Sequence, residues 1–136
     1  MKKPEIERIG FGVMADKDIH PRIFSHSDRF FVVDLKLRKE VILREHRPNP
    51  YGKICREKYI MPSLLGAHPP DEELEIYRNV AEILKDCDYV RGKNFGNDMV
   101  YALEKAGVEA MKSSSHEPDE WIDSLIESRY AAGYRD

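Results

Sequence analysis

The chain contains little cysteine: Cys55 and Cys87 are its only two in 136 residues, and they form no Cys-x-x-Cys motif. Two distant thiols do not support a disulfide scaffold, and they are too few for a zinc site built from thiolates. Cys87 precedes a predicted strand, so we expect it to be small and buried. Cys55 lies in a polar stretch that we expect to form a loop, where its thiol would be more accessible.

Long apolar runs and an excess of positive charge are also absent. No apolar stretch approaches the roughly 18 residues of a membrane span. The opening MKKPEIERIG has no apolar segment behind its basic residues, as a signal peptide would have. The net charge of −3 predicts no basic face for nucleic acid. We therefore expect a cytoplasmic protein with neither a membrane nor a nucleic-acid partner.

The common catalytic signatures are missing as well. There is no Gly-x-Ser-x-Gly elbow, no Walker loop, no Gly-x-Gly-x-x-Gly fingerprint and no His-x-x-x-His pair. Asp16 and Asp34 could hold magnesium for a nuclease-like reaction, but no third acidic residue on a neighbouring strand accompanies them. We therefore expect a protein that is not an enzyme, with magnesium-dependent hydrolysis as a minor alternative.

The apolar patterns that are present predict a single α/β domain over residues 1–136. The segment 8–16 alternates with period two, which is typical of a strand, and its glycines would let another segment pack closely on the sheet. The predicted elements, in order, are strands at 8–16, 29–36 and 40–47, a helix at 71–86, a strand at 88–91, a helix at 97–107, a strand at 108–113 and a helix at 117–130. Residues 46–70 are predicted to be a long irregular loop, and such loops tend to be functional or mobile.

The order β-β-β-α-β-α-β-α predicts a mixed five-stranded sheet with helices on its faces. We expect the first three strands to form an antiparallel meander, and the strands joined through helices to run parallel by right-handed crossovers. The third and fifth strands are candidates for exposed edges, which would permit a homodimer as well as a monomer.

Three connecting segments are expected to meet beyond the carboxyl ends of the parallel strands, where ligands bind in open α/β sheets. They are residues 16–26, the loop 46–70 and the turn 92–97. In the turn, Gly92, Lys93, Asn94, Gly96 and Asn97 would hold an anion through backbone amides and one ammonium group, or the turn could be tight without any ligand.

Metal ligands could come from the same loops. Imidazole is a common metal ligand, and His20, His26 and His68 fall in segments that we place near one end of the sheet. No fixed spacing links them, so a solvated surface histidine remains the alternative for each.

Four stretches of the chain carry a resemblance to a known family. They are IGFGVMADKD, RIFSHSDRFFVVDLKLRKEVILREHRPNP, LLGAHPPDEELEIYRNVAEILKDCDYV and FGNDMVYALEKAGVEAMKSS. Together they resemble the dinitrogenase iron–molybdenum cofactor biosynthesis family, the small NifX-like domain of nitrogenase accessory factors, over residues 6–130. Phe24, Phe30, Asp34, Asn49 and Pro50 match the family's pattern.

The resemblance implies a ribonuclease H-like three-layer fold and a binding or carrier protein for iron–molybdenum cofactor or an iron–sulfur precursor. His68 and His26, with Cys55 as a thiolate, would then be the metal ligands. The chain departs from the family at Ile23, where a histidine is usual, and its turn reads GKNFG instead of Gly-Gly-x-Gly. These departures favour the alternative of a protein-interaction or regulatory module that keeps the fold but has lost the cofactor.

Overall fold

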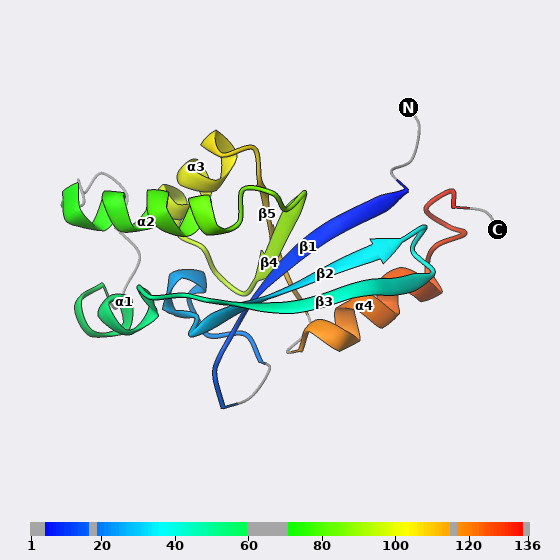
Figure 1. Cartoon of the computed structure of the whole chain (residues 1–136), viewed down its shortest axis with the longest axis horizontal. Coiled ribbons are helices and arrows are strands. Elements are labelled where there is room, and N and C mark those ends of the chain that lie inside the picture. Colours follow the sequence, from blue (N-terminus) through cyan, green and yellow to red (C-terminus); the bar gives the residue numbers. More distant parts are fainter. Residues whose placement is uncertain (1–4, 17–18, 60–70, 115–116, 135–136) are drawn as a thin grey trace.

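The computed structural model describes residues 5–16, 19–59, 71–114 and 117–134. The predicted strands and helices appear in the predicted order, with ends that differ by a few residues, and a short helix that was not predicted lies between the third strand and the first predicted helix (Figure 1). The elements are β1 (Ile6–Val13), a 3-10 turn η1 (Phe24–His26), β2 (Arg29–Lys36), β3 (Glu40–Pro48), α1 (Gly52–Lys58), α2 (Asp71–Ile83), β4 (Tyr89–Gly92), α3 (Asn97–Lys105), β5 (Glu109–Lys112) and α4 (Pro118–Glu127).

The strands form one mixed sheet in the order β3-β2-β1-β4-β5. β1 pairs with β2, and β2 with β3, in antiparallel register. β4 runs parallel to both β1 and β5. The predicted meander and the predicted parallel half of the sheet are both confirmed. β3 and β5 are its two edges, as expected.

β1 and β2 have buried side chains on both faces of the sheet, and helices cover both faces. Ile9, Phe11 and Val13 have no exposed surface and pack, with Trp121 and Ile122 of α4, on one face. The other face carries Phe30 and Val32 against residues of α2 and α3. Figure 1 accordingly shows α4 on the side of the sheet opposite α2 and α3. Cys87 lies in this second core and is buried, as predicted.

Gly12 in β1 lets η1 lie directly on the sheet. A Cβ atom there would overlap the hydroxyl of Ser27 and lie 3.0 Å from Cδ1 of Phe24. Both residues belong to the connection between β1 and β2. The expected close approach at the glycines of the first strand is therefore confirmed.

The predicted loop at residues 46–70 is wrong over its first part. His46 to Pro48 extend β3, and Gly52–Lys58 form α1. Asn49 explains the change of direction between them: its Oδ1 accepts a hydrogen bond from the Tyr51 amide at 3.1 Å, and its Nδ2 donates to Ser27 O at 2.8 Å. A seven-residue helix is shorter than the window over which apolar periodicity can be recognised. Residues 60–70 lie outside the described part of the chain.

Among the described residues, no helix has the length and apolar character that a membrane span requires.

Candidate functional site

Two of the expected segments do meet at one end of the sheet. The turn that follows β4 contacts η1, because the amide of Phe24 donates a hydrogen bond to the Asn94 carbonyl at 2.8 Å. The rings of Phe24 and Phe95 are stacked with their centroids 4.7 Å apart. Since η1 ends at His26, the histidine and the glycine turn belong to the same region of the molecule.

The inner side of the turn is closed by these two phenylalanines. Gly92 is buried, and a Cβ atom on it would lie 2.9 Å from Cδ1 of Phe24. Phe95 is only 5 % exposed. Gly92 therefore serves close packing of η1 and not the approach of a ligand, so the tight-turn interpretation holds for this residue.

The outer side of the turn remains polar and exposed. Lys93, Asn94 and Asn97 are exposed. Gly96 has a φ of 76°, a left-handed conformation that glycine adopts without strain, and its amide donates to Asn94 Oδ1 at 3.3 Å. The first amides of α3 follow directly, and the start of a helix favours negative charge.

A shallow pocket lies beside the start of α3. Its lining combines aromatic, apolar and polar residues: Ile23, Tyr59, Tyr77, Phe95, Gly96, Asn97, Asp98 and Met99. The hydroxyl of Tyr77 donates to Glu73 Oε1 at 2.8 Å, and both residues are buried. Burial, and next the hydrogen bond to Glu73, raises the pKa of Tyr77, so the phenol stays protonated.

His26 is half-buried next to this pocket, and its ring is held in one orientation. Its Nε2 lies 2.8 Å from the carbonyl oxygen of Tyr59. A carbonyl only accepts hydrogen bonds, so Nε2 carries the proton in the neutral ring and Nδ1 keeps its lone pair. Metal-binding histidines are commonly oriented by such a hydrogen bond from the other ring nitrogen. Arg56 of α1 donates to the His26 carbonyl at 2.8 Å and fixes the backbone at the same point.

Cys55 does not have the exposed thiol that we expected. It lies inside α1 with no exposed surface, and burial raises the pKa of its thiol to about 11. A thiol with this pKa is protonated at neutral pH, whereas a metal ligand must be a thiolate. The error follows from the missed helix, since α1 turns this side chain into the core.

The predicted metal centre is only partly within the described residues. The predicted ligand His68 is not among the described residues. Among the residues that are described, no group of three or more His, Cys, Asp and Glu side chains could hold a metal ion. His20 is buried, and its Nδ1 lies 2.8 Å from the Gly12 carbonyl. His26 is thus the one predicted ligand that the described residues place beside the turn with an orienting hydrogen bond.

Asp16 and Asp34 are not close enough to share metal ions. Asp34 pairs with Arg8 across the sheet, whereas Asp16 follows the far end of β1. The five residue steps from Arg8 to Val13 alone span roughly 17 Å of strand. Arg8 holds both oxygens of Asp34, at 2.8 and 2.9 Å. The two-metal arrangement is therefore wrong for this pair.

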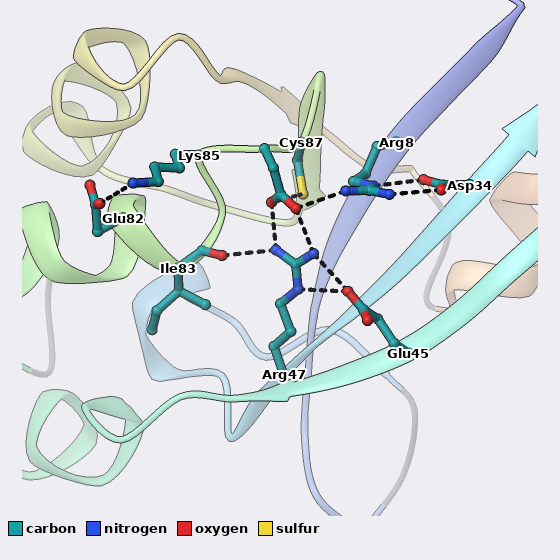
Figure 2. A network of polar contacts seen from close by, with 9 residues as sticks. Arg8, Asp34, Glu45, Arg47, Glu82, Ile83, Lys85 and Cys87 are labelled. Carbon is teal, nitrogen blue, oxygen red and sulfur yellow. Dashed lines mark hydrogen bonds and ion pairs between the residues drawn. The ribbon is translucent and has the colours of Figure 1, made fainter.

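A network of charged side chains on the α2 side of the sheet was not predicted. Arg47 donates to both oxygens of Asp86, at 2.6 and 2.8 Å, and to Glu45 at 2.8 Å (Figure 2). It also donates to the carbonyl of Ile83, the last residue of α2, at 2.9 Å. Arg8 joins the network through Asp86 Oδ2 at 2.8 Å. The arginines of this network donate hydrogen bonds to its carboxylates and to the Ile83 carbonyl, and these contacts attach the end of α2 to the sheet.

The comparisons with known proteins relate this chain to solved structures alone. No family model matches the sequence, and no curated protein matches it. The crystal structure of PH0822 is similar over 89 % of this chain and 91 % of that one, with a TM-score of 0.63 and 15 % identity. An NMR structure from Thermotoga (TM1290), described as a proposed NifB protein of the DUF35 family, covers 90 % of both chains with a TM-score of 0.54 and 19 % identity. At these identities the similarity concerns the fold alone.

Proposed function

We propose that this chain is a non-enzymatic binding protein of the NifX-like type with a ribonuclease H-like fold. Its ligand would be an anionic metal–sulfur cluster, such as iron–molybdenum cofactor or an iron–sulfur precursor. Two findings support the fold assignment: the strand order β3-β2-β1-β4-β5 with helices on both faces, and the similarity in fold to a proposed NifB protein.

The hydrogen bond from His26 Nε2 to the Tyr59 carbonyl is the observation that carries the proposal. It leaves Nδ1 as an oriented donor atom for a borderline or soft metal. Lys93 and the amides at the start of α3 would balance the negative charge of the cluster, with Asn94 and Asn97 as further polar contacts. His68 is the second expected ligand. Gly92 and Cys55, both buried, are left out of this ligand set.

Anaerobic reconstitution tests the proposal. Purified protein is offered iron, sulfide and molybdate, and bound metal is measured after gel filtration. We expect the wild type to retain iron and sulfide. His26→Ala removes the proposed ligand and should retain at least about tenfold less metal at limiting supply, because even loss of the group that orients a ligand has an effect of this size. His46→Ala is the matched control, because His46 is an exposed histidine on β3 that accepts a hydrogen bond from Arg29. Absence of uptake by the wild type, or equal uptake by His26→Ala, contradicts the proposal.

A second candidate is a protein-interaction or regulatory module with this fold that binds no cofactor. The stacked Phe24 and Phe95 and the buried Cys55 favour it, since they fill the end of the sheet with side chains. Its partner could be another protein or a second copy of this chain at an edge strand. In that case the protein takes up no metal or sulfide in the reconstitution experiment. Sedimentation of the metal-free protein then distinguishes a monomer from a homodimer.

A further inference from the structure

Arg91 is a buried cation without an anionic partner in the described part of the chain. It lies at the carboxyl end of β4, next to Gly92, and is 8 % exposed. Its Nε is buried and has no hydrogen-bond partner. The described residues offer its guanidinium no ion pair and no hydrogen bond. A charged group in this situation costs free energy, because it has lost water without gaining a counter-charge.

Four partly buried arginines differ from Arg91 because each is paired with an acidic side chain. Arg8, Arg38, Arg47 and Arg56 have side chains that are between 20 and 35 % exposed, and each lies within 2.9 Å of a carboxylate oxygen. The protein thus supplies an acid to every one of these less buried guanidinium groups. Arg91 is the most buried arginine of the described ranges and has no such acid among them, so an anion from elsewhere would supply its counter-charge.

An aromatic surface holds Arg91 in place on the α4 face of the sheet. Its Cζ lies 4.2 Å from the centroid of the Trp121 ring, a cation–π arrangement. The indole in turn makes edge contacts with Phe11 and Tyr89, each with a centroid distance of 5.7 Å. This contact stabilises the guanidinium from one side but leaves its buried Nε–H without an acceptor. Burial accordingly lowers the pKa of Arg91.

The surroundings add positive polarity. Trp121 is in the first turn of α4, and side chains of a helix lean toward its amino terminus. The residue before the helix, Glu117, makes no capping hydrogen bond with its side chain. Of the acidic residues in that turn, Asp119 is paired with Arg44 at 3.1 Å and Glu120 is exposed. The first turn of α4 thus has no side-chain cap from Glu117, and its residue Trp121 contacts Arg91.

We propose that Arg91 is the anchor of a binding site for a small oxyanion, a phosphate or carboxylate group, at the start of α4. The planar fork of a guanidinium matches two oxygens of such a group, and Trp121 keeps the fork in position. The carboxyl ends of parallel strands are where open α/β sheets bind ligands. This site is on the face of the sheet opposite η1 and α3, so it does not depend on the metal–sulfur proposal.

Thermal unfolding in potassium phosphate, potassium acetate and potassium chloride at equal ionic strength tests this site. A ligand that binds only the folded protein raises the Tm in a saturable way. We expect phosphate or acetate, but not chloride, to raise the Tm of the wild type. Arg91→Met keeps the packing on Trp121 and should weaken the fitted affinity by at least about tenfold, since it removes charged hydrogen bonds. Arg91→Lys keeps the positive charge without the planar, two-pronged guanidinium, so its fitted affinity should lie between those of the wild type and Arg91→Met.

Arg78→Met is the matched control, because Arg78 is an exposed arginine on α2 that pairs with Glu75, away from α4. Its response to phosphate should equal that of the wild type. An equal response in Arg91→Met would mean an adventitious ion only and would overturn the proposal, as would the absence of any saturable response in the wild type. If Arg91→Met does not fold, the Nε–H resonance of Arg91 in the wild type decides: it must shift saturably with phosphate, and an unchanged resonance overturns the site.

Discussion

Asp86 is the acidic residue that joins the two arginines of the charged network. Arg47 and Arg8 both donate to it, and it connects the end of α2 with β1 and β3. Hydrogen bonds from Arg47, opposed in part by burial, lower the pKa of Asp86 from 3.8 to about 2. The folded state therefore binds a proton at Asp86 less readily than the unfolded chain does.

This shift predicts a dependence of stability on acid pH. Because the folded pKa is lowered, the contribution of Asp86 is complete above pH 3.8 and is lost as the pH falls through about 2. The Asp86 side chain is 43 % exposed, so solvent screening reduces the contribution to about 1 kcal/mol. Urea unfolding of the wild type and Asp86→Asn should differ by this amount at pH 6 and converge toward pH 2.

Glu82→Gln is the control for that experiment. Glu82 is exposed and pairs with Lys85 one helical turn away, outside the Arg47 contacts. Its effect on the free energy of unfolding should be small, as for exposed ion pairs in general. A constant difference between the wild type and Asp86→Asn across this pH range would contradict the role given to the Arg47–Asp86 contact.

At the scale of elements, α1 packs Cys55 into the core and is also attached to the domain by polar contacts around η1. Asn49 donates to the carbonyls of Ser27 and Ser25, at 2.8 and 3.3 Å, and is buried. Arg56 reaches back to Asp28 at 2.7 Å. Because His26 is in η1 and its ring contacts Tyr59 just after α1, these contacts also position the candidate ligand.

Asn49→Ala should therefore loosen α1 and disturb the candidate site together. Leaving two buried carbonyls without their donor costs about 1 to 3 kcal/mol. Hydrogen exchange followed by mass spectrometry should show faster exchange over residues 52–58, while β1 and β2 exchange as in the wild type. Asn97→Ala, at an exposed asparagine, is the control and should leave α1 unchanged. Equal protection of α1 in both variants would show that Asn49 does not hold it.

The elements differ in how far the sequence alone could predict them. β2 spans Arg29–Lys36 as predicted, because four consecutive aromatic and β-branched residues, Phe30 to Val33, form its middle. The faces of β1 followed from its period-two alternation. α1 was missed since seven residues with few apolar positions carry no such period. Local pattern thus predicted the strands and the longer helices, but it missed a short helix held by tertiary contacts.

At the scale of the whole molecule, the topology was predictable and the polar pairing was not. The order of strands and helices restricts the sheet to few arrangements. Arg47 and Asp86, by contrast, are 39 residues apart, and nothing in the sequence pairs them. The same holds for Arg91, which reads as an ordinary strand residue until its burial over Trp121 is seen. Tyr134, near the end of the described chain, packs its hydroxyl 3.4 Å from Glu7 of β1, again across a long separation.

The ring nitrogens of His26 provide the most direct test of the account. Long-range proton–nitrogen NMR spectra of the protein with ¹⁵N-labelled histidine report the state of each ring nitrogen, before and after anaerobic addition of iron, sulfide and molybdate. We predict that the His26 Nε2 carries a proton, and that Nδ1 shows a large shift or broadening when the cluster components bind. A proton on Nδ1 instead, or His26 resonances that do not respond to any metal–sulfur species, would contradict it.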